Sequence, residues 1–117
     1  MQDFRRLRVW ARAHGLALAI YRESQGWGRG HGTLANQARR AAMSVSTNIT
    51  EGCGQVRPTE LARYLQISLA SASELDYHLQ FAADLGLLDA AVHATLRDEL
   101  LQVRRMLAVL RQHVLRG

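Results

Sequence analysis

The residues that could act as catalysts or metal ligands are few and scattered. The chain of 117 residues contains five histidines and one cysteine. No histidine belongs to an HExxH or similar pair, and a metal site needs ligands that converge from one face. Cys53 has no histidine near it in the chain and lies in a helical pattern, so we interpret it as a packed thiol rather than a nucleophile.

The spacing of the residues supports neither ribonuclease activity nor magnesium-dependent catalysis. A bundle-type ribonuclease needs an arginine five residues before a histidine, and no such pair occurs. The carboxylates Glu51 and Glu74 stand alone, so no cluster predicts a magnesium site. We therefore expect no enzymatic activity, no metal and no cofactor.

Arginine is the residue type that does offer chemistry. All fifteen basic residues are arginine, and the net charge is +5. Guanidinium groups bind phosphate bidentately and stack on bases, so these residues favour nucleic acid as a ligand. The positive excess lies in residues 1–54 and 87–117, whereas residues 55–86 are net negative. The candidate nucleic-acid ligands are Arg5, Arg8, Arg12, Arg39, Arg40, Arg104, Arg105 and Arg111.

The same arginines have plainer interpretations. Stripes of charge on helices are often solvated faces, and a GC-rich coding sequence explains the missing lysines equally well.

A second polar set lies in the stretch from residue 34 to residue 54. Ser44, Asn48 and Glu51 follow one another at i, i+4 and i+7, which places them on one side of a helix. Buried polar groups need partners, and Glu74 or the neighbouring arginines could supply them. This polar motif face is interpreted mainly as structural, with a ligand-directed role as the alternative. Asn48-Ile49-Thr50 also reads as a glycosylation triplet, but its helical context argues against that use.

The breaks in the chain define the elements that must position these residues. Glycines cluster in GWGRGHG, EGCG and LGLL, and the single proline is Pro58. Between the breaks, apolar residues recur at helical spacing, and no segment alternates with period two. We predict one all-α domain over residues 1–117, an antiparallel up-down four-helix bundle with helices at about 3–25, 33–53, 58–86 and 89–115. Pro58 fits the first turn of the third helix, and Asp89 the N-cap of the fourth.

Two of these helices carry more apolar surface than one bundle core needs. In the first, Phe4, Leu7, Ala11, His14, Leu18 and Tyr21 share one side, which we assign to the core. The apolar residues outside the core predict a homo-oligomer interface, because in a monomer they would be exposed to solvent. They are Val9, Leu16 and Ile20 on the first helix and Ile67, Tyr77 and Phe81 on the third.

The expected location is the cytoplasm. No run of about 18 apolar residues is present, so no membrane association is expected. The first fifteen residues lack the apolar core of a signal peptide, and one cysteine allows no internal disulfide.

Three motifs together resemble a known family. FRRLRVW followed by IY is similar to an F-x-x-L-x-V-W opening, and QARRAAMSVSTNITEG to a Q-x-R-R-A-A-x-S-[IV]-x-x-N-I-x-E-G motif. ELARYLQISLASASEL, residues 60–75, is similar to an E-x-x-R-[FY]-L-x-I-A-x-x-S-x-x-E-L motif. The chain thus resembles the 23S rRNA intervening-sequence proteins, which are similar to accessory proteins of diversity-generating retroelements.

The resemblance implies a four-helix bundle that forms a ring-shaped homopentamer and has no established activity. For partners, it implies RNA or DNA, and a reverse transcriptase or a ribosome-related protein. Arg39 and Arg40 match the second motif and carry over the idea of a basic scaffold. The predicted function is a non-enzymatic, oligomeric scaffold that binds nucleic acid, RNA more than DNA. The alternative is a purely structural or protein-binding assembly.

Overall fold

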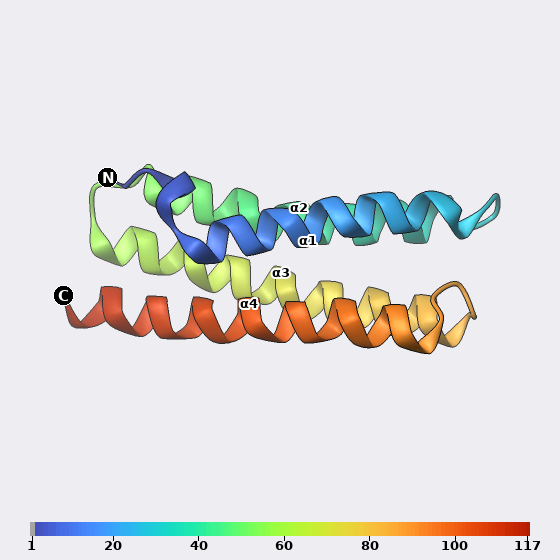
Figure 1. Cartoon of the computed structure of the whole chain (residues 1–117). Coiled ribbons are helices and arrows are strands. Elements are labelled where there is room, and N and C mark those ends of the chain that lie inside the picture. The colour runs from blue at the N-terminus through green and yellow to red at the C-terminus, as the bar shows by residue number, and fades with distance from the viewer. Residues whose placement is uncertain (1) are drawn as a thin grey trace.

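The structure is a computed structural model that describes residues 2–117. Four helices run up and down in antiparallel order and form a rod 46 Å long and about 20 Å across (Figure 1). No strand occurs in the described residues, so the predicted all-α, four-helix architecture is confirmed. The helices are α1 (Arg8–Ser24), α2 (Gly32–Cys53), α3 (Pro58–Asp84) and α4 (Ala90–Arg116).

Short turns modify both ends of the first predicted helix. A 3-10 turn, η1 (Phe4–Arg6), precedes α1, and a second, η2 (Gln25–Trp27), follows it. Leu7 separates η1 from α1 because its backbone is extended, with φ −80° and ψ 123°. The regular helix therefore begins at residue 8 and not near residue 3 as expected.

Two local signals in the sequence act as predicted. Pro58 occupies the first turn of α3, where its missing N–H leaves no hydrogen bond unmade. The Asp89 carboxylate accepts a hydrogen bond from the Val92 N–H at 2.8 Å and caps α4.

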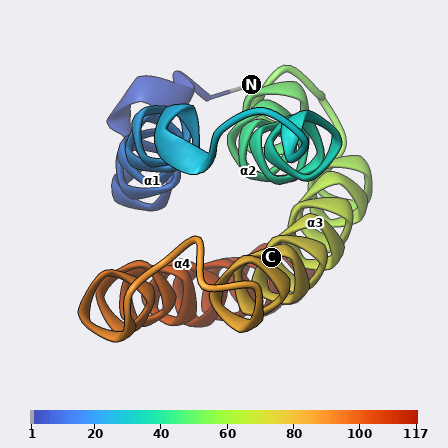
Figure 2. The same cartoon turned by 90° about the vertical axis from the view of Figure 1, so that its right-hand side faces the viewer.

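The helices are arranged in a ring when viewed along the rod (Figure 2). Each helix packs on its neighbours in the sequence, and α1 closes the ring against α4. The α2–α3 pair has the most extensive contact and the α1–α4 pair the least. No helix in the described residues has the length and apolar character needed to cross a membrane.

Small residues on α2 permit the close approach of α3. Ala38, Ala41 and Ala42 are buried on the side of α2 that faces the core. Near the end of the helix, a Cβ atom added to Gly52 would lie 2.8 Å from Leu61 Cδ1 and 3.0 Å from Tyr64 Cβ. The glycine of the EG sequence is thus required by packing rather than by a turn.

The core itself is aliphatic. Its largest fully buried side chains come from all four helices: Ile20, Ile49, Leu65, Leu75, Leu79, Leu100 and Leu107. One polar side chain, Ser68, is completely buried among them, and its hydroxyl donates to the Val45 carbonyl at 2.7 Å. This hydrogen bond offsets the cost of burying the hydroxyl and joins α3 to α2.

The face of α1 that enters the core is the opposite of the one expected. Val9, Leu16 and Ile20 are 4%, 4% and 0% exposed, so they cannot form an oligomer interface. Leu18 and Tyr21, which were assigned to the core, are 41% and 47% exposed. The buried face is aliphatic and has the small residues Ala13 and Ala17 between its larger ones, which suits close packing in the core, whereas Leu18 and Tyr21 line a groove between α1 and α2.

The close approach at Gly52 gives a stability prediction. Gly52→Ala is expected to destabilise the protein by about 1 to 2 kcal/mol, because the new methyl group overlaps Leu61 and Tyr64. Gly15→Ala on α1 is the matched control, since nothing lies within 4 Å of its added Cβ. Gly15→Ala should stabilise the folded protein by up to about 1 kcal/mol, because alanine has the higher helix propensity. Urea unfolding followed by circular dichroism measures both, and a stabilised Gly52→Ala would contradict the packing argument.

Candidate functional site

The structure divides the eight candidate arginines into those held by the fold and those left open. Arg12 belongs to the first group. Its Nε lies 2.7 Å from Glu99 Oε1 and its Nη2 lies 2.9 Å from Glu99 Oε2, which makes a bidentate ion pair between α1 and α4. These hydrogen bonds from Arg12 hold the pKa of Glu99 below its usual range. Arg12 is therefore a structural residue.

Arg39 and Arg104 are also engaged within the chain. The Arg39 Nε donates to the Ser24 hydroxyl at 2.7 Å, and its guanidinium stacks on the Tyr21 ring at 4.4 Å. Arg104 lies 3.7 Å from Asp76. Both arginines link neighbouring helices; the charge of Arg104 is partly neutralised by Asp76, whereas Arg39 is held in place by uncharged groups.

The remaining candidates differ in position. Arg5 is exposed and stacks on the Phe4 ring at 4.5 Å. Arg111 is half-buried, and its Nε has no hydrogen-bond partner in the described chain. Arg40 lies on α2, whereas Arg8 on α1 and Arg105 on α4 line the same groove at the α1–α4 seam.

That seam contains a groove of about 600 Å³, which we call the basic groove. Arg6, Arg8 and Arg105 line it, together with His113, and no carboxylate does. None of these three arginines forms an ion pair in the described residues. The floor is apolar and consists of Leu7, Val9, Met106, Val109 and Leu110. The groove thus combines positive charge at its rim with a hydrophobic base.

Local structure explains the rim. The extended Leu7 ends η1 and lets the chain enter α1 at a new angle, so Arg6 and Arg8 both border the groove. On α4, Arg105 and Val109 are one turn apart and share a face. Arg6 and His113 were not predicted as site residues from the sequence. The sequence signal for Arg6 is the run Arg5-Arg6-x-Arg8, which places three arginines within four residues.

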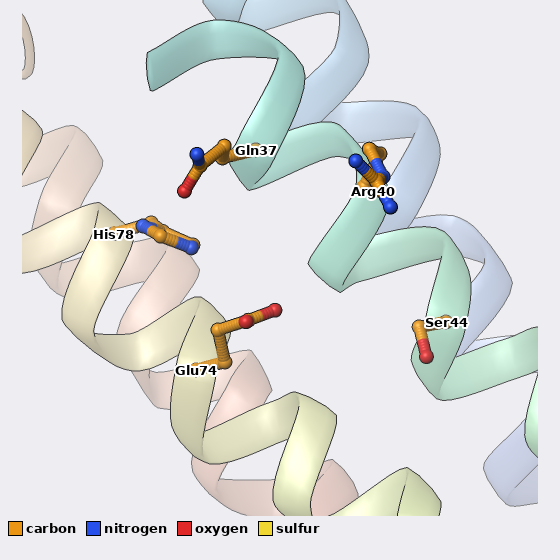
Figure 3. A pocket seen from close by; sticks show the side chains of 5 residues that line it. All are labelled: Gln37, Arg40, Ser44, Glu74 and His78. Carbon is orange, nitrogen blue, oxygen red and sulfur yellow. The ribbon is translucent and has the colours of Figure 1, made fainter. Parts of the chain in front are cut away.

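A second hollow, the polar cavity, lies between α2 and α3 and has a volume of about 370 Å³. Gln37, Arg40 and Ser44 enter it from α2, and Glu74 and His78 from α3 (Figure 3). Glu74 and Ser44 thus line the same cavity, but the Ser44 hydroxyl bonds Ser71 and not Glu74.

A hydrogen-bond network supports one wall of this cavity. The hydroxyls of Ser44 and Ser71 lie 2.7 Å apart, across the two helices. The Asn48 side-chain amide donates to the Ser44 carbonyl at 2.8 Å and to its hydroxyl at 3.0 Å. Glu51 does not join this network, because it lies nearly two turns further along α2 and its side chain is exposed.

Two apolar surfaces remain outside the core. On α3, Ile67, Tyr77 and Phe81 are 36%, 63% and 44% exposed, which agrees with their predicted outward position. A groove of about 520 Å³ lies between α1 and α2, and we call it the aromatic groove. Its apolar lining includes Phe4, Trp10, Leu18, Tyr21 and Met43. On α1, the outward apolar face consists of Trp10, Leu18 and Tyr21, and not of Val9, Leu16 and Ile20.

The structure offers neither a reactive thiol nor a metal site in the described residues. Cys53 is buried, and burial raises the pKa of its thiol, which disfavours the reactive thiolate. Among residues 2–117, no group of three or more histidine, cysteine or acidic side chains is placed to hold a metal ion.

Four antiparallel helices, with no strand among residues 2–117, define the class as a small all-α bundle protein. The chain belongs to the family of the 23S rRNA-intervening sequence protein, whose model matches residues 5–109. It is similar to the crystal structure, at 1.70 Å resolution, of a protein with unknown function from the S23 ribosomal protein family of Bacteroides thetaiotaomicron VPI-5482. The TM-score is 0.82 and the identity 16%, over 88% of this chain and 97% of that chain, so this likeness shows the fold alone. No curated protein matches the chain.

The Arg12–Glu99 pair predicts a pH-dependent stability. Because the folded pKa of Glu99 is depressed, its contribution is complete above the unfolded pKa and is lost as the pH falls through the folded pKa. The stability difference between the wild type and Glu99→Gln should therefore be largest near neutral pH and shrink towards about pH 3.

Urea midpoints across this pH range measure the difference. Glu60→Gln is the control, because Glu60 pairs with Arg63 at 3.3 Å on the exposed surface of one helix, where ion pairs contribute little. A pH-independent difference for Glu99→Gln would refute the assignment.

Proposed function

We propose that the protein is a non-enzymatic, self-assembling scaffold that binds RNA through the basic groove. The observation that supports this most directly is that the arginines of the groove have no carboxylate beside them. Arg6, Arg8 and Arg105 border one hollow that no carboxylate lines, while Arg12, Arg39 and Arg104 are held by other residues. A site of uncompensated guanidinium groups has the chemistry of phosphate binding.

The floor of the groove favours RNA with unpaired nucleotides over a regular duplex. Met106, Val109 and Leu110 offer apolar surface on which the face of a base or a ribose can rest. Single-stranded RNA exposes such faces, whereas a duplex presents mainly its phosphates and the edges of its grooves. A basic rim with an apolar floor fits a looped or single-stranded segment better.

The same floor also supports a second candidate function. A protein segment with acidic and apolar residues on one helical face would match the rim and the floor at once. In that reading the protein is a purely protein-binding assembly, and a reverse transcriptase or a ribosome-related protein is the partner that the family resemblance suggests. Nucleic-acid binding measured with purified components separates the two functions.

Self-assembly is proposed from the two apolar surfaces outside the core. The aromatic groove lies on the α1–α2 side, and the ridge of Ile67, Tyr77 and Phe81 lies on α3. Because the two surfaces differ from one another, a contact between the ridge of one copy and the groove of the next is heterologous, and it forms a ring when the rotation between copies closes. A homopentamer is the ring that the resemblance implies, and a ring repeats the basic groove once per subunit, so the positive fields add.

The first test concerns the basic groove. We expect Arg8→Gln with Arg105→Gln to weaken binding of a labelled, looped RNA about tenfold at low salt, because two phosphate contacts are lost. The slope of log affinity against log salt should fall by about 1.4 to 1.8. Fluorescence anisotropy of nuclease-treated protein over a salt series measures both quantities.

The matched control removes the same charge elsewhere. Arg22→Gln with Arg29→Gln changes two exposed arginines that form no ion pair in the described residues. Equal losses in the two variants would show that the attraction is diffuse. An absence of binding by the wild type at low salt would overturn the nucleic-acid function and favour the protein partner.

The second test concerns assembly. Tyr77→Glu with Phe81→Glu should convert the oligomer to monomers, because two carboxylates would have to be buried in the contact. Val109→Glu is the control, since Val109 is 67% exposed but lies in the basic groove, away from the ridge. Light scattering coupled to size-exclusion chromatography gives the mass. A wild-type protein that is monomeric at high concentration would disprove the proposed ring.

A further inference from the structure

The polar cavity is a separate site from the basic groove. The cavity opens at the α2–α3 seam and the groove at the α1–α4 seam, and these seams lie on opposite sides of the bundle (Figure 2). The polar cavity also lies nearer the end where α2 begins, whereas the basic groove lies nearer the end where α1 begins (Figure 1). A ligand of the cavity is therefore a second binding function, beyond the proposed use of the groove.

His78 is the first indication of a ligand. Its side chain points into the polar cavity (Figure 3), and the residue is only 8% exposed. Its imidazole makes no hydrogen bond within the described chain, although every protonation state of the ring has at least one donor to satisfy. The ring nitrogens are not sealed inside the protein, so a molecule that occupies the cavity can form hydrogen bonds with them.

The charged groups of the cavity, Arg40 and Glu74, are exposed residues that form no ion pair within the described chain. They stand on facing helices, and the Glu74 carboxylate points into the space between α2 and α3 (Figure 3). The Gln37 amide extends from α2 towards His78. The cavity therefore presents a cation and an amide on one side and a carboxylate and an imidazole on the other.

The wall below these groups is fixed. Ser44 is held by Ser71 and by Asn48, so its hydroxyl is already committed to the two helices. Site groups carried on helices and braced by such bonds keep their relative positions, which favours binding of a ligand of defined shape.

The donor and acceptor pattern identifies the ligand class. A carboxylate that is free at both oxygens is best matched by two adjacent N–H donors on a planar edge. Guanine carries N1–H and N2–H₂ side by side on its Watson–Crick edge, whereas adenine, cytosine and uracil each offer donors from one nitrogen there. The O6 and N7 acceptors of guanine suit Arg40 and the Gln37 amide. A volume of about 370 Å³ falls in the range of small-ligand sites.

We propose that the polar cavity binds a guanine base. Glu74 accepts from N1–H and N2–H₂, Arg40 and Gln37 donate to the opposite edge, and His78 bonds the base or its ribose. A free amino acid could also span the two charges, but it would leave the amide and the imidazole without partners. The base can belong to a free nucleotide or to an unpaired residue of RNA, since the cavity is open to solvent.

Calorimetric titration of the full-length, nucleotide-free protein with GMP, IMP and AMP tests this proposal. GMP should bind, and IMP should bind about tenfold more weakly, because inosine lacks the 2-amino donor to Glu74. AMP should bind no more tightly than IMP. Glu74→Gln should abolish the preference for GMP over IMP. Glu51→Gln, an exposed glutamate on α2 outside the cavity, should leave it unchanged.

A pentamer of uridine with one central guanosine distinguishes the two sources of the base. The measurement uses Arg8→Gln with Arg105→Gln, so that the basic groove does not contribute. Binding of this RNA that is tighter than that of GMP and of a pentamer of uridine alone assigns the cavity to RNA, and binding equal to that of GMP assigns it to the nucleotide. Equal affinity for GMP and IMP, competition by free amino acids, or no binding of either guanine ligand would overturn the proposal. Arg8→Gln with Arg105→Gln should leave GMP binding intact, so a failure of the groove and a failure of the cavity can be told apart.

Discussion

The close approach of α2 and α3 is the constraint on which the other features depend. Alanines along α2 and the glycine at position 52 remove the side chains that would hold the helices apart. At this separation the hydroxyl of Ser68 reaches the Val45 carbonyl, and Ser44 reaches Ser71. The polar cavity is the place on the same seam where longer side chains replace the small ones. The small residues of α2 thus determine the most extensive helix contact, the hydrogen bonds across it and the position of a candidate binding site.

The contacts between neighbouring helices also determine which arginines have a charged partner. Arginines that lie between helices are matched by an acceptor from the neighbouring helix, as Arg12 is by Glu99 and Arg104 by Asp76. Arginines at the α1–α4 groove have no such acceptor, because that part of the seam is lined by aliphatic residues. The net charge of +5 is therefore less informative than the location of the unmatched groups. An arginine with an acceptor on the neighbouring helix has a structural role, and an arginine without one is a candidate for binding.

The features that could be predicted from the sequence are those set by local pattern. Helical spacing and glycine clusters predicted the four helices, and Pro58 and Asp89 predicted two helix starts. The inward face of α1 could not be predicted, because both its faces are apolar and the choice depends on the shape of α2. Nor could the ion pair between Arg12 and Glu99, since its partners are 87 residues apart. The basic groove needed the turn at Leu7, which no spacing rule indicates.

The ring order of the helices has a consequence for how the bundle opens. Three of its seams join helices that follow one another in the chain, and only the α1–α4 seam joins the first helix to the last. Closing this seam costs the most chain entropy, and its packing is the least extensive, so it should form last during folding. Amide protons along α1 should then exchange with solvent earlier than those of α2 and α3. An occupant of the basic groove would bridge the two helices and slow this opening, so hydrogen exchange in α1 reports on the groove without any label on its ligand.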